Sequence, residues 1–319
     1  MSAPPPGKPA AESRQAVKTH HRPRGYIANY RPRAETQALL AEVELVLEEY
    51  QDDWPLTVRQ IFYRLVGAYG HAKTAAFYER LCDHLSNARR GRLIPFEAIR
   101  DDGVSVMAPA HYANEDEFHA TVADMAGRYR QDKLASQQVQ LEVWCEAAGM
   151  MPQLARVAHE YSVPVYSSSG FDSTTAKYSL AQRIWRLWKG TVVLHLGDFD
   201  PSGEALFAAV SEDVRAFVLE DRLTAAVDVE FERVALTPNQ IERFDLPRDD
   251  VKESSHSPTW AWDYSCQLEA LPPDVVAAEL RAAIERRFDL DRWRQDRRAE
   301  YVTRQHLRYA LPAAGESST

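Results

Sequence analysis

The chain has 319 residues, and its apolar fraction of 45% and charged fraction of 27% are ordinary for a globular protein, which excludes wholesale disorder and fibrous classes. It contains neither an apolar run near the roughly 20 residues of a membrane helix nor a secretory signal, and its three cysteines are widely spaced. We therefore expect a cytoplasmic protein with no membrane partner, whose net charge of −9 argues against simple coating of nucleic acid.

Positive charge is nevertheless concentrated in the N-terminal third. Residues 1–34 contain seven Lys and Arg against one acid, and residues 59–100 contain eight against three. A basic segment in an acidic chain indicates either DNA binding or scattered, solvated arginines. We expect a double-stranded DNA partner and hence a location at the nucleoid. The bases expected to contact DNA are Arg64, Lys73, Arg89, Arg90 and Arg92.

Helices are expected to dominate the N-terminal part. Residues 1–24, rich in Pro and charge, predict a disordered basic tail. Apolar residues at three- and four-residue spacing predict a helix over 34–51. Thr57 and Gln60 form a T-x-x-Q capping box that opens a second helix, and a third is expected over 73–88.

A short hairpin is expected after these helices. Residues 91–99 predict two extended pieces around Pro95. Three helices followed by a hairpin are typical of a winged helix, and we assign residues 25–110 to such a CAP-like, DNA-binding domain that carries the candidate tyrosine described below. Residues 111–137 are expected to form a linker helix, and residues 312–319 a flexible tail.

Strands and helices alternate from residue 138 onward. This alternation is typical of an α/β domain with a mainly parallel sheet flanked by helices, which we place at 138–311. The expected strands cover 139–145, 163–166, 191–196 and 227–234, and the expected helices cover 147–160, 173–188 and 202–220.

Carboxylates follow two of these strands. The strand 191–196 is almost wholly apolar, as expected of a strand buried on both faces, and Asp198 and Asp200 come soon after it. Residues two apart in extended backbone point the same way, so both carboxylates should project from the carboxyl edge of the sheet. Glu146 follows an earlier strand at the same edge. Such hard oxygen ligands suit Mg²⁺, with Mn²⁺ as an alternative.

Other interpretations of these residues remain open. Each acid could be a solvated loop residue or a helix N-cap, and Glu146 is favoured at a helix start by the helix dipole. D-x-D after a buried strand also occurs in haloacid-dehalogenase-type phosphatases, an interpretation that leaves Glu146 without a role. His195, inside the apolar strand, is expected to be a hydrogen-bonded core residue rather than a ligand.

One tyrosine is a candidate nucleophile. In the helix opened by Thr57 the apolar residues share one face, and Tyr63 lies on the other face, one turn after Arg59. We therefore expect its hydroxyl to be exposed. Tyrosine can act as a covalent nucleophile, and an adjacent guanidinium favours the phenolate or holds the phosphate under attack. The alternative is an exposed tyrosine without a catalytic role.

These segments resemble the motifs of one family. The segment RQIFY at 59–63 resembles the R-x-x-Y-Y segment of the topoisomerase VI A subunit and of its relative, the meiotic double-strand-break transesterase, with Phe62 in place of the first tyrosine. The segment DFDPSG at 198–203 is similar to the family's D-x-D-P-x-G, its Toprim metal motif, and Glu146 matches the Toprim glutamate.

The resemblance implies a winged helix followed by a Toprim domain, in a compact, stand-alone, bacterial-type member of the family. It implies a Mg²⁺-dependent DNA-cleaving transesterase in which Tyr63 attacks a backbone phosphate that Arg59 steadies. The metal ligands that it implies are Glu146, Asp198 and Asp200. It also implies a homodimer, because tyrosine and metal come from opposite subunits in the family, and a separate chain for any ATPase or accessory subunit. The alternatives are a hydrolytic Toprim nuclease and a DNA-binding module without catalysis.

Overall fold

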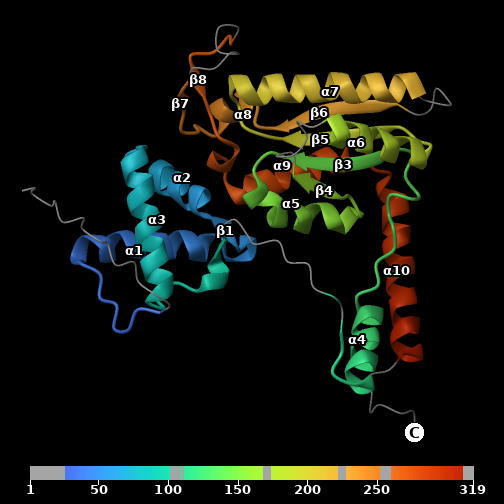
Figure 1. The fold of residues 1–319 in the computed structure, drawn as a ribbon, viewed down its shortest axis with the longest axis horizontal. Coiled ribbons are helices and arrows are strands. Elements are labelled where there is room, and N and C mark those ends of the chain that lie inside the picture. The colour runs from blue at the N-terminus through green and yellow to red at the C-terminus, as the bar shows by residue number, and fades with distance from the viewer. Residues whose placement is uncertain are drawn as a thin grey trace, which may run out of the picture.

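The computed structural model describes residues 26–100, 109, 111–167, 174–221, 228–251 and 260–311. The tails expected at residues 1–24 and 312–319 lie outside this part of the chain. Figure 1 shows a helical N-terminal part beside a larger part built on a sheet. Within the described residues, no helix combines the length and the apolar character that a membrane span requires.

Three helices form the N-terminal part, as the sequence predicts. They are α1 (Ala34–Glu49), α2 (Val58–Tyr69) and α3 (Ala75–Arg90), with the 3₁₀-helix η1 (Gln51–Asp53) after the first. The predicted capping box is formed, because the Thr57 hydroxyl accepts the Gln60 N–H at 3.1 Å and the Gln60 side chain accepts the Thr57 N–H at 2.8 Å. These bonds fix the start of α2, the helix that carries Arg59 and Tyr63.

The hairpin expected at residues 91–99 is not formed. The chain makes a turn and the 3₁₀-helix η2 (Phe96–Ala98), and the strand β2 (Ile99–Arg100) follows. This strand pairs in parallel with β1 (Leu56–Thr57), an earlier segment of the chain. Pro95 has no N–H to donate to a hairpin ladder, and its carbonyl instead accepts the N–H that closes the 3₁₀ turn at 3.3 Å. The described part of this region therefore contains the three helices but no wing.

The larger part of the chain contains the predicted parallel sheet (Figure 1). Four strands pair in the order β4–β3–β5–β6, and every pair is parallel. The strands are β3 (Gln140–Cys145), β4 (Val165–Ser167), β5 (Thr191–Leu196) and β6 (Val229–Ala235). The central strands β3 and β5 are almost wholly buried, because helices cover both faces of the sheet.

Two pairs of helices supply these covers. On one face, α5 and α9 pack together and contribute Leu154 and Leu280 to the main hydrophobic core. On the other face, α6 and α7 pack together and form a second core with Trp144 and Val193 of the sheet. The bounds are α5 (Met151–Ala158), between the 3₁₀-helices η3 (Ala148–Met150) and η4 (His159–Tyr161), α6 (Thr174–Leu187), α7 (Pro201–Asp221) and α9 (Pro273–Glu285).

Further elements lie at the two ends of the sheet. Near its carboxyl edge, β7 and β8 form a short antiparallel pair, and Cys266 just after β8 pairs with Phe199. At the opposite end, α10 extends away from the sheet, and α4 packs beside it (Figure 1). Helix α4 lies within residues 111–137, the segment expected to form a linker helix. The bounds are α4 (Glu115–Gly127), α8 (Pro238–Arg243), β7 (Asp249–Asp250), β8 (Tyr264–Ser265), η7 (Leu268–Ala270) and α10 (Leu290–Ala310).

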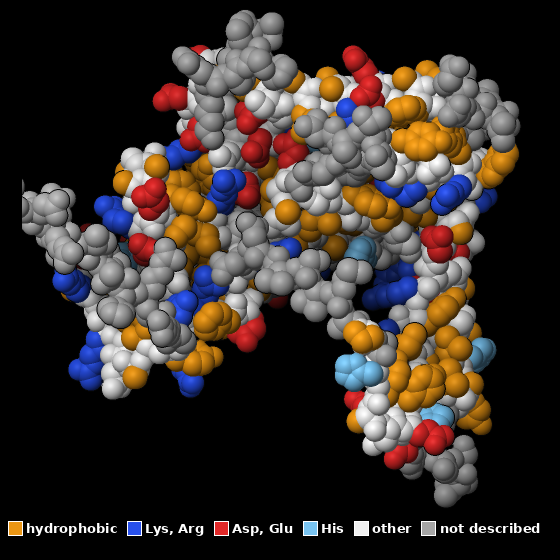
Figure 2. All heavy atoms as spheres, in the orientation of Figure 1, with side chains coloured by type: hydrophobic (Ala, Val, Ile, Leu, Met, Phe, Trp, Pro, Cys, Tyr) orange, Lys and Arg blue, Asp and Glu red, His pale blue; other side chains and the backbone are white. Residues whose placement is uncertain are grey.

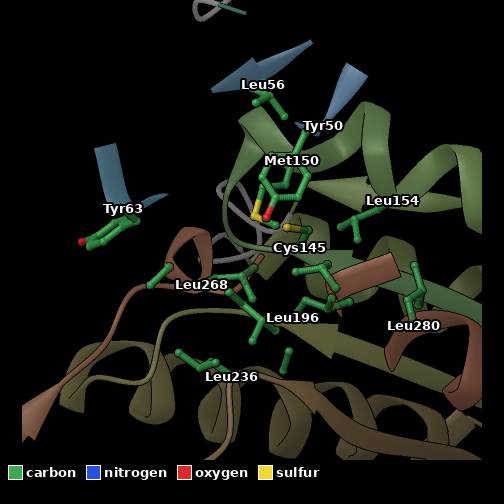
Figure 3. Close-up of a cluster of buried hydrophobic side chains, with 14 of the residues drawn as sticks. Tyr50, Leu56, Tyr63, Cys145, Met150, Leu154, Leu196, Leu236, Leu268 and Leu280 are labelled. Atoms are coloured by element: carbon green, nitrogen blue, oxygen red, sulfur yellow. The ribbon is translucent and has the colours of Figure 1, made fainter. Parts of the chain in front are cut away.

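The N-terminal helices and the sheet part share one hydrophobic core. Figure 3 shows Tyr50 and Leu56 from the N-terminal part beside Met150 from the sheet part. A buried polar contact crosses the same boundary, since Gln60 Nε2 on α2 donates to Gln153 Oε1 on α5 at 2.7 Å. This packing holds α2 against the sheet part, where η7 lies next to it.

Candidate functional site

The three predicted carboxylates lie together at the carboxyl edge of the sheet. β3 and β5 are neighbours, so the residues that follow them meet at this edge. Glu146 Oε2 accepts the backbone N–H of Asp198 at 3.0 Å, and Asp200 Oδ1 accepts that of Gly203 at 2.7 Å. A Cβ atom on Gly203 would lie 3.3 Å from Glu146 Oε2 and 3.4 Å from Asp200 Oδ1. The carboxylates of Glu146 and Asp200 therefore lie against the first turn of α7. The backbone of Asp198 is hydrogen-bonded to Glu146.

A glycine between β5 and the D-x-D segment allows this approach. A Cβ atom on Gly197 would lie 2.5 Å from the carboxyl carbon of Glu146, closer than non-bonded carbon atoms come. The carboxylate of Glu146 is held in place by the Asp198 N–H, so a larger residue at 197 would have to displace it. The sequence LGDFD thus combines a buried strand end, a residue without a side chain and two acids.

Burial raises the pKa of the acids at this edge. The pKa of Glu146 is raised to about 7, first by burial, with the charges of Asp198 and Asp200 adding to the effect and Arg233 opposing it. Burial also raises the pKa of Asp198, although the Leu268 N–H donates to its Oδ1 at 2.8 Å and stabilises the charged form. Negative charge that is costly to bury favours a bound cation or proton here.

His195 is the buried core residue that the sequence predicts. The Arg233 guanidinium donates to its Nδ1 at 2.9 Å, so the proton of the neutral ring is on Nε2. Burial, followed by the charge of Arg233, holds the pKa of His195 well below its usual value. Nε2 lies 3.5 Å from Glu146 Oε1, an oxygen that accepts no hydrogen bond from the described residues. The neutral ring adds no positive charge beside Glu146, and Arg233 is the cation that opposes the rise in its pKa.

These carboxylates are the kind of ligand that Mg²⁺ and Mn²⁺ prefer, but they do not surround one point. In the part of the chain that the structure describes, no three His, Cys, Asp or Glu side chains are arranged to hold a metal ion as they stand. One oxygen of Glu146 and one of Asp198 already accept a backbone N–H. The buried and unpartnered Glu146 Oε1 is the observation that fits a cation at this edge.

A hollow of about 730 Å³ separates the acidic edge from helices α2 and α3. Arg59 borders it from α2, where its side chain is half exposed and its Nη1 lies 4.0 Å from Glu269 Oε1. Figure 2 shows Asp and Glu side chains gathered where the N-terminal helices meet the sheet part, with Lys or Arg beside them. Glu146 borders the hollow from the sheet. The other ionisable residues on its helix side are Tyr78, Cys82, Asp83, Arg89 and Arg100.

Tyr63 is buried, so the prediction of an exposed hydroxyl is wrong. Only 5% of its surface is exposed, and its hydroxyl donates to Asp249 Oδ2 at 3.5 Å. Lys73 Nζ lies 2.9 Å from Oδ1 of the same Asp249 and 5.2 Å from the centre of the Tyr63 ring. Burial, followed by the charge of Asp249, raises the pKa of Tyr63 well above its usual value, and Arg59 opposes this only in part. The cause is that η7 and the β7 strand cover the polar face of α2.

Tyr63 and the predicted metal ligand Glu146 border different hollows. Tyr63 borders a smaller hollow of about 180 Å³, together with Pro247 and Glu269. Arg59 and Glu146 border the larger one. In Figure 3 the Tyr63 hydroxyl points away from the core cluster. Within one chain, Tyr63 and Glu146 therefore do not share a hollow. Asp200 borders a third hollow of about 60 Å³ together with Asp249, the acceptor of the Tyr63 hydroxyl.

Two of the five predicted DNA contacts are paired inside the chain. Arg64 Nη2 lies 2.5 Å from a carboxylate oxygen of Glu49, and Lys73 is paired with Asp249. Lys73 also donates to the carbonyl of Pro247 at 2.8 Å. Their charges are balanced locally, which reduces the attraction that each can offer to a phosphate.

The remaining three predicted contacts lie at the end of α3 and just after it. Arg89 is buried and borders the larger hollow, with its guanidinium 5.7 Å from the ring centre of Phe96. Arg90 is half-buried in the last turn of the helix. The guanidinium of Arg92 stacks on Tyr26, 4.3 Å from its ring centre. Of the five, Arg89 is thus the one that faces the hollow shared with the acids.

Sequence reasoning missed Glu269, which borders both hollows. Its side chain is 7% exposed, and its Oε2 has no hydrogen-bond partner among the described residues. Burial, followed by the charge of Asp198, raises its pKa, and Arg59 opposes the shift. Glu269 lies on η7, far beyond the D-x-D segment and outside any motif, so no signal in the sequence pointed to it.

Comparison with protein-family models, with curated proteins and with solved structures finds no match to this chain. Only the residues and their geometry therefore bear on function. The geometry contributes an acidic sheet edge, an arginine-lined helical wall and a hollow between them.

Proposed function

We propose that this protein is a divalent-metal-dependent, DNA-cleaving transesterase that resembles the topoisomerase VI A subunit, with Tyr63 as the nucleophile and a Toprim-type acidic edge. The supporting observation is that α2 presents Arg59 to the same hollow as Glu146. Arg59 lies one turn before Tyr63, and the helix that carries both packs against η7, which carries Glu269. We include double-stranded DNA as the substrate and a homodimer as the active form.

The reaction would exchange one phosphoester for another. The Tyr63 oxygen forms a bond to phosphorus, the bond from phosphorus to a deoxyribose oxygen breaks, and the proton lost by Tyr63 is balanced by one gained by the deoxyribose hydroxyl. Arg59 and Arg89, which border the hollow, would hold the phosphate oxygens by charge-assisted hydrogen bonds.

The acids would hold the metal ion. The candidate ligands are Glu146, Asp198 and Asp200, and the unpartnered Glu146 Oε1 supports this assignment. A divalent ion bound there supplies positive charge that stabilises the phosphate during transfer. His195, kept neutral by burial and Arg233, would add no positive charge beside Glu146 that competes with the ion.

The buried tyrosine sets a condition on this proposal. The Tyr63 hydroxyl has to leave Asp249 before it can reach a phosphate. Since Tyr63 borders a different hollow from Glu146 in its own chain, attack at the acids of a second subunit fits the geometry better than attack within one chain. A homodimer is therefore part of the proposal.

Hydrolysis is the second candidate function, and the burial of Tyr63 favours it. A tyrosine that is 5% exposed and has a raised pKa is a poor nucleophile, whereas water can enter the larger hollow directly. In that case Tyr63 would only pack, and a metal-activated water would cut the same phosphate.

Trapping a covalent adduct separates the two candidates. The full-length protein is incubated with supercoiled plasmid and Mg²⁺ or Mn²⁺, stopped with detergent and analysed with and without protease. We expect wild-type protein to leave DNA ends that carry protein, and Tyr63→Phe to leave none. Tyr69→Phe, on the same helix, is the matched control and should behave as wild type.

The outcomes are distinct. Cleavage by Tyr63→Phe at the wild-type rate, together with loss of cleavage in Asp200→Asn, would replace the transesterase by the hydrolytic nuclease. Absence of cleavage by the wild-type protein under all these conditions would leave a DNA-binding module as the better description.

A further inference from the structure

Two residues that border the larger hollow each have a buried carboxylate oxygen without a hydrogen-bond partner among the described residues. Glu146 Oε1 belongs to the residue after β3, and Glu269 Oε2 belongs to η7. Both residues border the hollow, and among the described residues neither oxygen has a partner. Glu269 has no place in the proposed set of metal ligands, although it is the more deeply buried of the two.

Asp198 physically connects these two carboxylates. Its backbone N–H donates to Glu146 Oε2 at 3.0 Å, and its Oδ1 accepts the backbone N–H of Leu268 at 2.8 Å. Glu269 is the next residue after Leu268, so its position is fixed relative to the D-x-D segment by this hydrogen bond. The chain therefore holds Glu146, Asp198 and Glu269 as one connected unit, although Glu269 is far from the other two in sequence.

Arg59 balances the charge of Glu269 only in part. Its Nη1 lies 4.0 Å from Oε1, at the outer limit of an ion pair, and the Arg59 side chain is half exposed while Glu269 is almost fully buried. Oε2, the other oxygen, has no donor at all in the described part of the chain. A buried carboxylate in this state is costly unless a cation or a proton balances its charge. Glu269 borders the hollow, which gives a cation a route to its side chain.

We infer that Glu269 is a further ligand of the divalent cation at the acidic edge, together with Glu146 and Asp198, to which it is connected. This inference rests on the metal chemistry of the proposed function. Mg²⁺ and Mn²⁺ retain several waters and accept substrate oxygens, so a site with few protein ligands that is open to the hollow suits them. With its carboxylate engaged by the cation, Glu269 would release Arg59 toward a phosphate in the hollow.

Direct measurement of Mn²⁺ binding tests the inference. Titration of the full-length protein, with free Mn²⁺ followed by electron paramagnetic resonance, gives the Kd in the absence of DNA. We expect Glu269→Gln to raise this Kd by about tenfold or more, as loss of a supporting ligand does in other metal sites. The control is Asp83→Asn, which removes an exposed carboxylate from the opposite wall of the same hollow and should change the Kd less than about twofold.

Thermal unfolding gives a second readout that does not depend on activity. Without metal, Glu269→Gln should unfold at a higher temperature than wild type, because a buried, unpaired charge is removed. With saturating Mn²⁺ the wild-type protein should gain more thermal stability than the variant, because tighter binding to the native state stabilises it more. A higher unfolding temperature without metal also shows that the variant folds.

The outcomes separate this inference from the proposed function. Unchanged Mn²⁺ affinity in Glu269→Gln, or an equal loss in Asp83→Asn, would overturn the inference. If Glu269→Gln binds Mn²⁺ normally while wild-type protein forms the Tyr63 adduct, the inference fails and the proposed function stands. If Glu269→Gln loses Mn²⁺ affinity but the wild-type protein cuts no DNA, the site is real and the proposed function fails.

Discussion

The buried polar groups around Tyr63 are paired with one another, whereas those at the acidic edge include oxygens without a partner among the described residues. The Tyr63 hydroxyl donates to Asp249, which is itself paired with Lys73 at 2.9 Å, so this cluster balances its own charges. At the acidic edge, Glu146 and Glu269 each keep an oxygen without a partner among the described residues, and both face a hollow.

This difference indicates where the cation of the proposed function would bind. A cluster whose hydrogen bonds and charges are already paired is stabilised little by a bound ion or phosphate. Buried carboxylates without partners are stabilised much more by a bound cation. The acidic edge therefore has unpartnered groups that the proposed cation would stabilise, and under the proposed function the Tyr63 hydroxyl would have to leave Asp249. The following predictions test each half of this contrast.

The largest expected effect is that of pH on the stability of the metal-free protein, through the acidic edge. Glu146 has its pKa raised to about 7, so the native protein holds a proton that the unfolded chain has already lost above its usual carboxyl pKa. Metal-free protein should therefore lose stability, by up to about 3 kcal/mol, as the pH rises from about 4.5 to about 7. The measurement is chemical unfolding at several pH values with a chelator present.

A matched variant isolates that effect. Glu146→Gln cannot titrate, so its stability should fall less than that of the wild type over the same pH range. His195 acts in the opposite direction, because its lowered pKa adds stability as the pH rises, and it is common to both proteins. If the stability of the wild type and of Glu146→Gln depended on pH in the same way, Glu146 would not carry the expected effect of burial on its pKa.

The next effect concerns release of the tyrosine. Asp249→Ala removes the acceptor that holds the Tyr63 hydroxyl and lifts a charge that raises its pKa. We expect the yield of covalent protein–DNA adduct to rise a few-fold on denaturing gels. Asp250→Ala, an exposed neighbour on the same strand, is the control and should leave the yield unchanged. A strong decrease in Asp249→Ala would instead make Asp249 a base that accepts the tyrosine proton.

A smaller effect is expected on stability when the same hydroxyl is removed. Tyr63→Phe deletes a buried group whose single hydrogen bond is long, at 3.5 Å, so the free energy of unfolding should fall by about 1 kcal/mol or less. The measurement is denaturant unfolding of the full-length protein, with Tyr69→Phe as the comparison. A loss well above this value would mean that the Tyr63–Asp249–Lys73 cluster behaves as a tightly coupled unit.

The smallest effect compares DNA binding by an arginine that borders the larger hollow with that by an arginine outside it. Arg89→Gln should weaken binding to DNA of any sequence and reduce the salt slope of the affinity by about 1, because Arg89 borders the hollow. Arg64→Gln should change both quantities less, because Arg64 is already paired with Glu49. Fluorescence anisotropy at several salt concentrations measures both. Equal slopes for the two variants would mean that DNA does not enter the hollow.

The sequence predicts the parts that depend on local patterns. The apolar run 191–196 forms β5 over those same residues, because a run of this kind has few alternatives to a buried strand. Thr57 and Gln60 form their capping box from adjacent turns of one helix. Glu146 and the D-x-D acids meet because parallel neighbours end at one edge, which the alternation of strands and helices already indicates.

The parts that failed depend on distant segments. Tyr63 lies on the polar face of α2, but Asp249 and η7 cover that face from much later in the chain. Glu269 joins the acids through tertiary packing alone, so periodicity and motifs carry no trace of it. The hairpin at 91–99 failed for a local reason, since Pro95 favours a 3₁₀ turn, and the strand after it pairs backward with β1.

The bridge between Phe199 and Cys266 offers a chemical reporter of opening. Phe199 lies between the two D-x-D acids, and its N–H and carbonyl both bond to the backbone of Cys266, at 2.8 and 2.9 Å. The same β7–β8 pair carries Asp249, so a movement of this pair that frees the Tyr63 hydroxyl would also disturb the Cys266 thiol. Cys266 is 1% exposed, and burial raises its pKa to about 12, which keeps it from reacting in the closed form. The rate at which Cys266 is alkylated would therefore report how often the β7–β8 segment opens. Cys145, which is equally buried, would serve as the reference for opening elsewhere in the protein.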